Sequence, residues 1–383
     1  MPRLLYLLAL CNLVIGTGAF VPAGILAQIA ASLHISIAAA GQAMTAYALA
    51  TAVLAPLALV LTGRWPRRRA LWVGMAVFGL GNLVSALAGT LPLLLAGREL
   101  MGVGAMFTPV AAGIAVALVE PARRGRALSL VFIGISMSYV IGLPLGAWLG
   151  LRFGWHTPVA LVGAASWLMC ALLAHWLPRD IAAPGASFEG LAGLLARPAV
   201  LWTLAMTLLY FIAIFLVFAY IGPVLQALVP MSGERLSFTL MLFGLSGVVG
   251  TLIGGWANDR FSARPTLALQ LGVLASMMLL VPLTQGHYAL LVAVFVVWGI
   301  AGFGMMTPQQ SRLAALSPTQ APILLSLNTS MLYFGTALGA AIGGAVSGAV
   351  GFDHMAWVGV PFALAGLLTL WISRGKAGLL QTV

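Results

Sequence analysis

The feature that most constrains this chain is a series of apolar runs, each about as long as a helix that crosses a lipid bilayer. A spanning helix needs ~20 mainly apolar residues, and its backbone must satisfy its own hydrogen bonds in lipid. Twelve runs meet that length: residues 4–27, 38–61, 70–89, 92–117, 126–150, 157–177, 198–225, 236–257, 265–284, 288–311, 322–348 and 355–373. The sequence therefore predicts an all-α polytopic membrane protein with twelve transmembrane helices.

Composition argues against the other fold classes. Hydrophobic residues form 62% of the chain, well above the ~45–50% of soluble domains. A membrane β-barrel would show ~10-residue segments of alternating polarity, and the runs here are continuous. The first run is too long for a signal peptide and lacks a convincing cleavage site, so we interpret it as the first span. Cys11 and Cys170 lie within apolar runs and are interpreted as small buried side chains.

The basic residues predict the orientation of the spans. The connection between the second and third runs contains Arg64, Arg67, Arg68 and Arg69. If the N-terminus is cytoplasmic, fifteen of the 18 basic residues lie on the cytoplasmic side, Arg152 and Arg235 lie outside, and Arg98 lies within a span. This bias is typical of inner-membrane proteins and predicts that both termini are cytoplasmic. The net charge of +11 then reflects topology and not a nucleic-acid partner.

Internal matches divide the chain into two halves. Three glycines of the fifth run, Gly142, Gly146 and Gly150, match Gly335, Gly339 and Gly343 at a spacing of 193. Residues 128–130 match 325–327 at 197, and Thr108-Pro109 matches Thr307-Pro308 at 199. We predict an N-terminal six-helix bundle (1–178), a cytoplasmic linker (179–197) and a C-terminal bundle (198–383). Two such halves predict a substrate site at the midplane between them.

Several motifs resemble those of the major facilitator superfamily. The arginine connection, LVLTGRWPRRRAL over residues 59–71, resembles the loop between helices 2 and 3 of that family. Residues 95–104, LAGRELMGVG, resemble its helix 4 arginine motif, and residues 142–146, GLPLG, resemble the helix 5 motif associated with antiporters. The resemblance implies two pseudo-symmetric bundles that work as a secondary transporter by alternating access.

A finer resemblance concerns one branch of that family. Residues 219–223, 242–244 and 254–260 are similar to helices 7 and 8 of the drug/proton antiporter branch, and Pro66 to Arg68 look most like arabinose- or sugar-efflux-like permeases. The first helix departs from the sugar-efflux pattern. Those relatives commonly read Gly-Thr-Thr-Glu-Phe, whereas residues 16–20 read GTGAF and lack the acidic residue.

Arg98 and Glu99 are the ionisable pair that we place within the hydrocarbon. Arg98 lies ~9 Å along the helix from the start of its span, and intramembrane charges mark functional sites by default. The resemblance places Arg98 at a position tied to proton transfer or substrate contact. Neighbouring residues on a helix point ~100° apart, so both side chains cannot face the same cavity squarely. Glu99 is a candidate proton carrier, or it neutralises Arg98, or it turns outward.

A second set of residues is predicted to support conformational change. Glycines at four-residue spacing allow close helix contact, and Pro144 favours a bend; ordinary small-residue packing is the alternative. The second copy of the arginine loop keeps an aspartate, Asp259, where the first has Gly63. We predict that Asp259 forms a one-sided cytoplasmic latch with the start of span 5. The candidate gating residues are Arg64, Arg67, Arg68, Asp259, Arg260, Gly142, Pro144 and Gly146.

Aromatic, thioether and amide side chains in several spans form the candidate substrate cavity. They are Asn12, Phe20, Gln42, Tyr47, Met106, Phe107, Tyr139, Tyr210, Phe211, Phe218, Tyr220, Trp298, Asn328 and Tyr333. For each of them, helix packing is the alternative role. Spans 1, 2, 5, 7, 10 and 11 contain no Asp, Glu or Lys, so the cavity offers little to offset the desolvation of an organic cation. It suits a small neutral or amphipathic compound better.

The resulting hypothesis is proton-driven efflux of a small drug-like or sugar-like compound by a monomer in a bacterial inner membrane, in contact with membrane lipid. A proton-independent facilitator or nutrient-uptake permease of the same fold is the alternative. A non-transporting sensor built on this fold is a further alternative. A membrane-embedded enzyme would need clustered His, Asp or Glu within the spans, and none is present, so we expect neither enzymatic activity nor a cofactor or metal.

Overall fold

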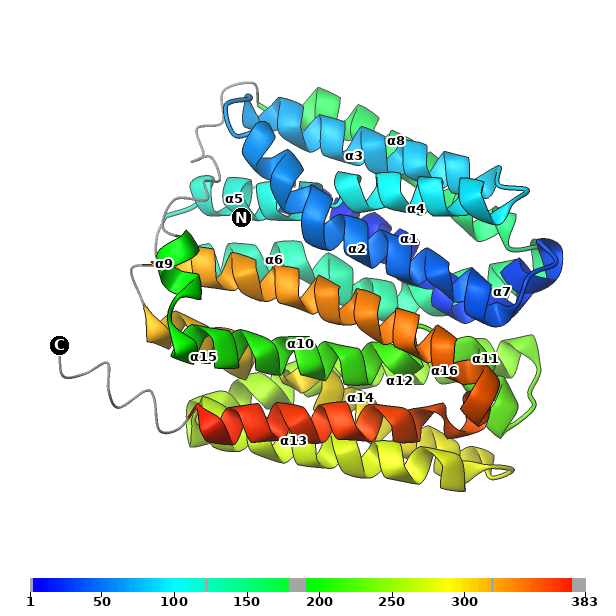
Figure 1. The fold of residues 1–383 in the computed structure, drawn as a ribbon. Helices are drawn as coiled ribbons and strands as arrows, with labels where there is room; N and C mark the ends of the chain where they lie inside the picture. The colour runs from blue at the N-terminus through cyan, green and yellow to red at the C-terminus, as the bar shows by residue number, and fades with distance from the viewer. Residues whose placement is uncertain (1–2, 121–122, 179–190, 318–319, 374–383) are drawn as a thin grey trace. The chain divides into compact units, whose positions relative to one another are not determined.

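The computed structural model describes residues 3–120, 123–178, 191–317 and 320–373, and every regular element in these ranges is a helix (Figure 1). In the first half the helices are α1 Arg3–Ser32, α2 Ile37–Leu61, α3 Arg67–Ala86, α4 Leu91–Gly104, α5 Phe107–Ala117, α6 Arg124–Met137, the π-helix η2 Ser138–Gly142, α7 Leu143–Phe153 and α8 His156–Trp176. In the second half they are α9 Leu191–Leu195, α10 Pro198–Phe218, α11 Ile221–Leu228, α12 Gly233–Phe261, α13 Ala263–Leu280, the 3-10 helix η3 Val281–Thr284, α14 Tyr288–Gly304, α15 Met306–Leu316 and α16 Ala321–Ile372.

The chain forms two compact units. Unit 1 contains Met1–Ser187 and Gly233–Met241, and unit 2 contains Phe188–Ser232 and Leu242–Val383. The predicted domain limits stay a prediction, and residues 179–190 of the predicted linker lie outside the described residues.

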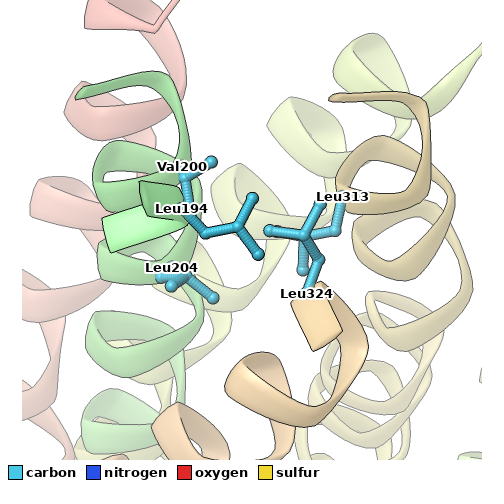
Figure 2. Close-up of a cluster of buried hydrophobic side chains, with 5 residues drawn as sticks. All are labelled: Leu194, Val200, Leu204, Leu313 and Leu324. Atoms are coloured by element: carbon cyan, nitrogen blue, oxygen red, sulfur yellow. The ribbon is translucent and has the colours of Figure 1, made fainter. Parts of the chain in front are cut away.

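The end of the predicted linker is part of a folded core. It forms the short helix α9, whose Leu194 is fully buried in a cluster of apolar side chains from α10, α15 and α16 (Figure 2). The other members of this cluster are Val200, Leu204, Leu313 and Leu324. Residues 191–195 therefore belong to unit 2 and are not only a connection.

The described residues contain eleven helices that are long and apolar enough to cross a membrane. The last of them, Ile323–Ile372, has 50 residues and would measure ~75 Å as one helix, far more than the ~30 Å of bilayer hydrocarbon. Gly351 interrupts it with φ 74° and ψ 163°, and Figure 1 shows its red second part running back in the direction opposite to its orange first part. It therefore provides two spans, and the predicted fold of twelve transmembrane helices is confirmed.

Prolines interrupt the fourth span of each half at matched positions. Pro109 has no N–H for the carbonyl of Ala105, and the chain leaves helical pairing between α4 and α5 there. Pro308 stands in the same relation to Gly304, where α14 ends before α15. The two Thr-Pro pairs recognised in the sequence therefore mark equivalent breaks.

The first span of each unit also breaks at a matched position. In α1, Ile25 leaves helical geometry with φ −124° and ψ 17°. Tyr220, which lies 195 residues later, separates α10 from α11 with a similar φ of −115° and ψ of 23°. Pro22 precedes the first break, whereas Pro223 follows the second.

The three matched glycines of each half lie against that broken helix. A methyl group on Gly142, Gly146 or Gly150 would meet the side chains of Thr17, Val21 and Ile25 on α1, respectively. Pro144, just after η2, has no N–H for the carbonyl of Val140, and the π-helix lies at this interruption. In α16 the equivalent glycines face backbone atoms of α10, and no proline follows the first of them.

Candidate functional site

Arg98 lies on α4 and is almost fully buried inside unit 1, with 2% of its surface exposed. Its guanidinium group donates three hydrogen bonds to backbone carbonyls. Nη1 donates to Gly18 at 2.7 Å, Nη2 to Ala19 at 2.9 Å, and Nε to Ala43 at 3.0 Å. Arg98 thus connects α4 to both α1 and α2.

The carbonyl of Gly18 is available because of the proline one turn later. In a regular helix that oxygen would accept from the N–H of residue 22, but Pro22 has none. A buried carbonyl without a partner costs ~1–3 kcal/mol, and the Arg98 guanidinium supplies the missing donor. A proline and an arginine that lie 76 positions apart in the sequence therefore form one structural unit.

The remaining neighbours of Arg98 are neutral. Its guanidinium carbon lies 4.8 Å from the ring centre of Tyr47, a cation–π contact, and Met101 Sδ lies 3.5 Å from Nη1. Glu99 is exposed on the other face of α4 and forms no ion pair with it within the described part of the chain. The two side chains therefore point apart, as the rotation between neighbouring helical residues predicts.

A small cavity lies beside Arg98 in unit 1, with room for about one water molecule. Asn82, Ser85 and Trp155 line it together with Arg98. The Oγ of Ser85 and the Nε1 of Trp155 are buried without a hydrogen-bond partner among the described residues. These three residues were not predicted from the sequence, although Asn82 and Ser85 are uncommon polar residues within an apolar run.

Within unit 1, the predicted cavity residues form separate small groups. Phe20 stacks on Tyr139 with ring centres 4.4 Å apart. Asn12 is fully buried, donates to the carbonyl of Val131 at 3.0 Å, and accepts from Thr108 at 2.9 Å. Three further predicted residues complete the set, with Met106 and Phe107 buried and Gln42 half-buried.

Unit 2 gathers its aromatic residues into a continuous row. From α10, the rings of Tyr210, Phe211, Phe215 and Phe218 follow one another at 4.7–5.8 Å. Phe218 then stacks on Phe243 of α12 at 5.8 Å. Phe243 in turn stacks on Trp298 of α14 at 5.2 Å. Of this row, Phe215 and Phe243 were missed, because an aromatic residue among apolar ones carries no signal of its own.

A buried polar cluster in unit 2 corresponds to the Asn12 and Thr108 pair of unit 1. Thr207 on α10 donates to Asn328 Oδ1 at 2.6 Å and accepts from Gln309 Nε2 at 2.8 Å. That amide also donates to the carbonyl of Thr203 at 2.7 Å. Asn328 was predicted, whereas Thr203 and Thr207 were missed, because each hydroxyl has its neighbouring helical carbonyls as ordinary partners.

Unit 2 contains three predicted tyrosines. Tyr210 belongs to the aromatic row and donates from its hydroxyl to the carbonyl of Gly302, whereas Tyr220 and Tyr333 lie outside the row. Tyr220 is fully buried and donates to the carbonyl of Ala340 at 2.9 Å. Tyr333 on α16 is half-buried.

The arginine loop shows three different environments. Arg64 is exposed, Arg67 is buried and donates to the carbonyl of Gly63 at 2.6 Å, and Arg68 donates to the carbonyl of Ala174 at the end of α8. In the second copy, Asp259 and Arg260 are exposed, and Asp259 accepts from Asn258 at 3.3 Å. The predicted latch for Asp259 stays a prediction. The described residues contain no group of three His, Cys, Asp or Glu side chains that could hold a metal.

Comparison with known proteins gives the family. The sequence model described as Major Facilitator Superfamily matches residues 8–321 and 231–380, which together cover nearly the whole chain. The chain belongs to the major facilitator superfamily. Its members are transporters, so this major facilitator protein is an integral membrane transporter and not an enzyme.

Two curated relatives are similar over almost their full length. The MFS-type transporter YbcL of Bacillus subtilis (strain 168) is 29% identical over 382 residues, which cover 98% of this chain and 97% of YbcL. The inner membrane transport protein YdhP of Escherichia coli (strain K12) is 32% identical over 366 residues, which cover 94% and 93%. The arabinose-efflux-like assignment is not resolved by these matches and stays a prediction.

Solved structures share the fold of this major facilitator protein at low sequence identity. A D-xylose-proton symporter superimposes with a TM-score of 0.80 at 15% identity, covering 97% of both chains. A bacterial homologue of the human lysosomal transporter Spinster, inward-facing and occupied, gives 0.79 at 18% identity, covering 98% of this chain and 96% of its own. These likenesses concern the fold alone.

Proposed function

We propose that this transporter exports a small neutral or amphipathic compound, drug-like or sugar-like, in exchange for protons and by alternating access. The observation that carries the substrate class is the sign of its buried charges. Among the described residues, the fully charged side chains that are buried are Arg67, Arg98 and Arg312, and no carboxylate is buried. An organic cation would lose its hydration without an opposing charge, whereas a neutral compound has no such cost.

The aromatic row of unit 2 supports the same substrate class. Rings provide large apolar contacts with a specific geometry, and Tyr and Trp add a polar group at one edge. The buried amides of Asn12 and Asn328 supply polar groups within the spans. A mainly apolar surface with a few fixed polar groups fits an amphipathic ligand.

The exchange with protons is supported by the antiporter-like motif at residues 142–146 and by the interrupted helix at η2. Short π-helices occur frequently at functional sites. Glu99, within its span, and Asp259, at the cytoplasmic end of span 8, are the candidate proton carriers. Both are exposed in this structure, so a proton route through either requires the side chain to change its surroundings during transport.

A second candidate function follows from that exposure. Glu99 does not face the interior of unit 1, and Ala19 stands where the first-helix pattern has its acidic residue. The lack of a buried carboxylate in the described part of the chain also fits a proton-independent facilitator or a nutrient-uptake permease. The two candidates differ in one measurable property, the response to a pH gradient.

The deciding experiment is counterflow of a compound panel in proteoliposomes, with and without an imposed pH gradient. Proton exchange predicts that the gradient accelerates transport and that Glu99→Gln abolishes this acceleration. Glu120→Gln is the matched control, because Glu120 is also exposed but lies outside the spans. This variant should retain the acceleration by the pH gradient. Transport that ignores the gradient would establish the second candidate, and a preference for organic cations would contradict the neutral substrate class.

Orientation and assembly complete the proposal. We place both termini in the cytoplasm of a bacterial cell and treat the transporter as a monomer in contact with membrane lipid. Reporter fusions at each terminus test the orientation, because a periplasmic signal from either end would contradict it. The mass of the detergent-solubilised particle tests the monomer.

A further inference from the structure

Two arginines of unit 2 converge on the last residue that the structure describes. Arg264, at the start of α13, donates from Nη2 to the backbone carbonyl of Ser373 at 2.9 Å. Arg312, on α15, donates from its own Nη2 to the hydroxyl of Ser373 at 2.5 Å. Ser373 follows the end of α16, so three helices bring two positive charges to one point.

No negative charge accompanies this pair in the described residues. The other contact of Arg312 is Met206 Sδ at 3.7 Å, a neutral thioether. The described carboxylates of unit 2 have other surroundings, because Asp353 pairs with His354 at 2.9 Å and Asp259 is exposed beside Asn258. Arg312 is only 8% exposed. Burial of one guanidinium next to another is costly without an anion.

The equivalent end of unit 1 shows that helix capping needs only one arginine. Arg68 lies 196 positions before Arg264 and donates to the carbonyl of Ala174, in the last turn of α8. A cation at a helix C-terminus is favourable because the carbonyl end of the helix dipole is negative. The position 199 residues before Arg312 is Gly113, which has no counterpart charge. Arg312 is therefore an addition that capping does not explain.

The surface next to Ser373 has the character of a lipid-facing helix that reaches the membrane boundary. Leu364, Leu368 and Trp371 are spaced along one face of α16 and are all exposed, with Trp371 at 67%. Exposed tryptophans concentrate at the membrane–water interface. The sequence continues after Ser373 with Arg374 and Lys376, and the positive-inside bias predicts that this end is cytoplasmic.

We infer that Arg264, Arg312 and Ser373 form a binding site for one phosphate-bearing anion, supplied by an anionic phospholipid headgroup or as free phosphate. The planar guanidinium groups match phosphate oxygens in geometry and charge. The hydroxyl of Ser373 donates to the carbonyl of Leu370 at 2.9 Å and positions Arg312 by accepting from it. Basic pockets between helices on the cytoplasmic side suit anionic headgroups. The site is independent of the substrate and of the proton coupling proposed above.

Native mass spectrometry of the full-length protein measures the site directly. The purified protein is exchanged into detergent with equal amounts of phosphatidylglycerol and phosphatidylcholine, and retained lipid is counted. We expect preferential retention of phosphatidylglycerol and a loss of roughly tenfold in its affinity for Arg312→Gln and Arg264→Gln. Arg68→Gln is the matched control, because it removes the same kind of carbonyl contact at a helix end that lacks a second arginine.

A second arm separates the two sources of phosphate. Delipidated protein is titrated with inorganic phosphate at constant ionic strength while its thermal unfolding is followed. Stabilisation that Arg312→Gln abolishes, without selective lipid retention, identifies free phosphate as the ligand. Ser373→Ala keeps both charges and provides a variant that folds even if loss of an arginine does not; we expect it to weaken binding severalfold. Equal retention in the wild type and these variants with no response to phosphate overturns the site, as does an equal loss in Arg68→Gln.

Discussion

The first spans of the two units, α1 and α10–α11, break at equivalent positions but are supported in different ways. In unit 1, Pro22 lies before the break and leaves the carbonyl of Gly18 without its helical donor, and Arg98 bonds to it. In unit 2, Pro223 lies after the break, and the body of α10 stays regular. The position 199 residues after Arg98 is Val297, which cannot donate a hydrogen bond from its side chain. A shift of one proline therefore accounts for an arginine bonded to the first span of unit 1 that has no counterpart on the first span of unit 2.

The two units also differ in how tightly a neighbouring helix packs against the broken span. A methyl group on Gly339 of α16 would meet the backbone oxygen of Ile212 at 2.7 Å and the nitrogen of Leu216 at 2.9 Å. On α7, the matched Gly146 faces only the side chain of Val21. Backbone cannot move aside as a side chain can. We call the contact of the matched glycines with the first span of each unit its glycine seam. The seam of unit 2, between α16 and α10, is therefore rigid, whereas the seam of unit 1, between α7 and α1, is adjustable and lies next to the π-helix.

The largest expected effect concerns the cation of unit 1. Arg98→Met should lower the free energy of unfolding by about 3 kcal/mol, because it removes three charge-assisted hydrogen bonds and leaves a buried carbonyl unpaired. In a Pro22→Ala background, residue 22 regains the N–H that Gly18 needs. The cost of Arg98→Met should then fall by about 1–2 kcal/mol in a double-mutant cycle followed by unfolding in detergent.

The control for this cycle is Val297→Met, at the equivalent position of unit 2, which should change stability by no more than about 0.5 kcal/mol. Additive effects of Arg98→Met and Pro22→Ala would contradict the link between proline and arginine. In that case the difference between the two first helices would need another cause.

A smaller effect distinguishes the two glycine seams. Gly339→Ala should destabilise the protein by about 2 kcal/mol, because the new methyl group meets backbone atoms that cannot shift. Gly146→Ala should cost about 1 kcal/mol, because Val21 can change its rotamer. Thermal unfolding of both variants in the same detergent tests the order. If Gly146→Ala proved the more damaging, unit 1 would not be the adjustable half.

The smallest effect concerns the paired polar clusters. Thr207→Val removes two hydrogen bonds, to Asn328 and from Gln309. Their loss should lower the free energy of unfolding by about 2 kcal/mol, and the apolar packing of valine should offset part of this loss. Thr108→Val removes one bond, to Asn12, and should cost about half as much. We expect the net difference to be about 0.5–1 kcal/mol in unfolding measurements. Equal costs would show that Gln309 adds nothing to the cluster.

The number and order of the spans could be predicted because membrane length and apolar composition determine them together. The repeat also followed from sequence, since Gly142 and Thr108 have recognisable partners in the second half. The sequence placed Arg98 within a span, and the structure places it within α4; its depth in the membrane stays a prediction. The rotation of α4 was another matter. Both faces of most spans are apolar, so periodicity gave no sign that Arg98 faces inward and Glu99 outward.

The partners of the candidate residues could not be predicted for a related reason. The acceptors of Arg98 are backbone carbonyls, which every residue has, and only the position of Pro22 distinguishes Gly18. Phe215 and Phe243 gain their significance from neighbours on other helices. Charge produced a different limit. Arg264 and Arg312 contributed to the count of cytoplasmic basic residues, but that count contained nothing about their meeting at Ser373.

Gly351 has a practical consequence for mapping this transporter. A single left-handed residue connects the last two spans within α16, so this connection offers no loop in which to insert an epitope, a reporter or a protease site. Any other residue there would strain the backbone. A methyl group on Gly89, between α3 and α4, would meet no other atom within 4 Å. The twelve-span order predicts that Gly89 and Gly351 lie on the same side of the membrane. Gly89 is therefore the more suitable place for a tag that reports this side.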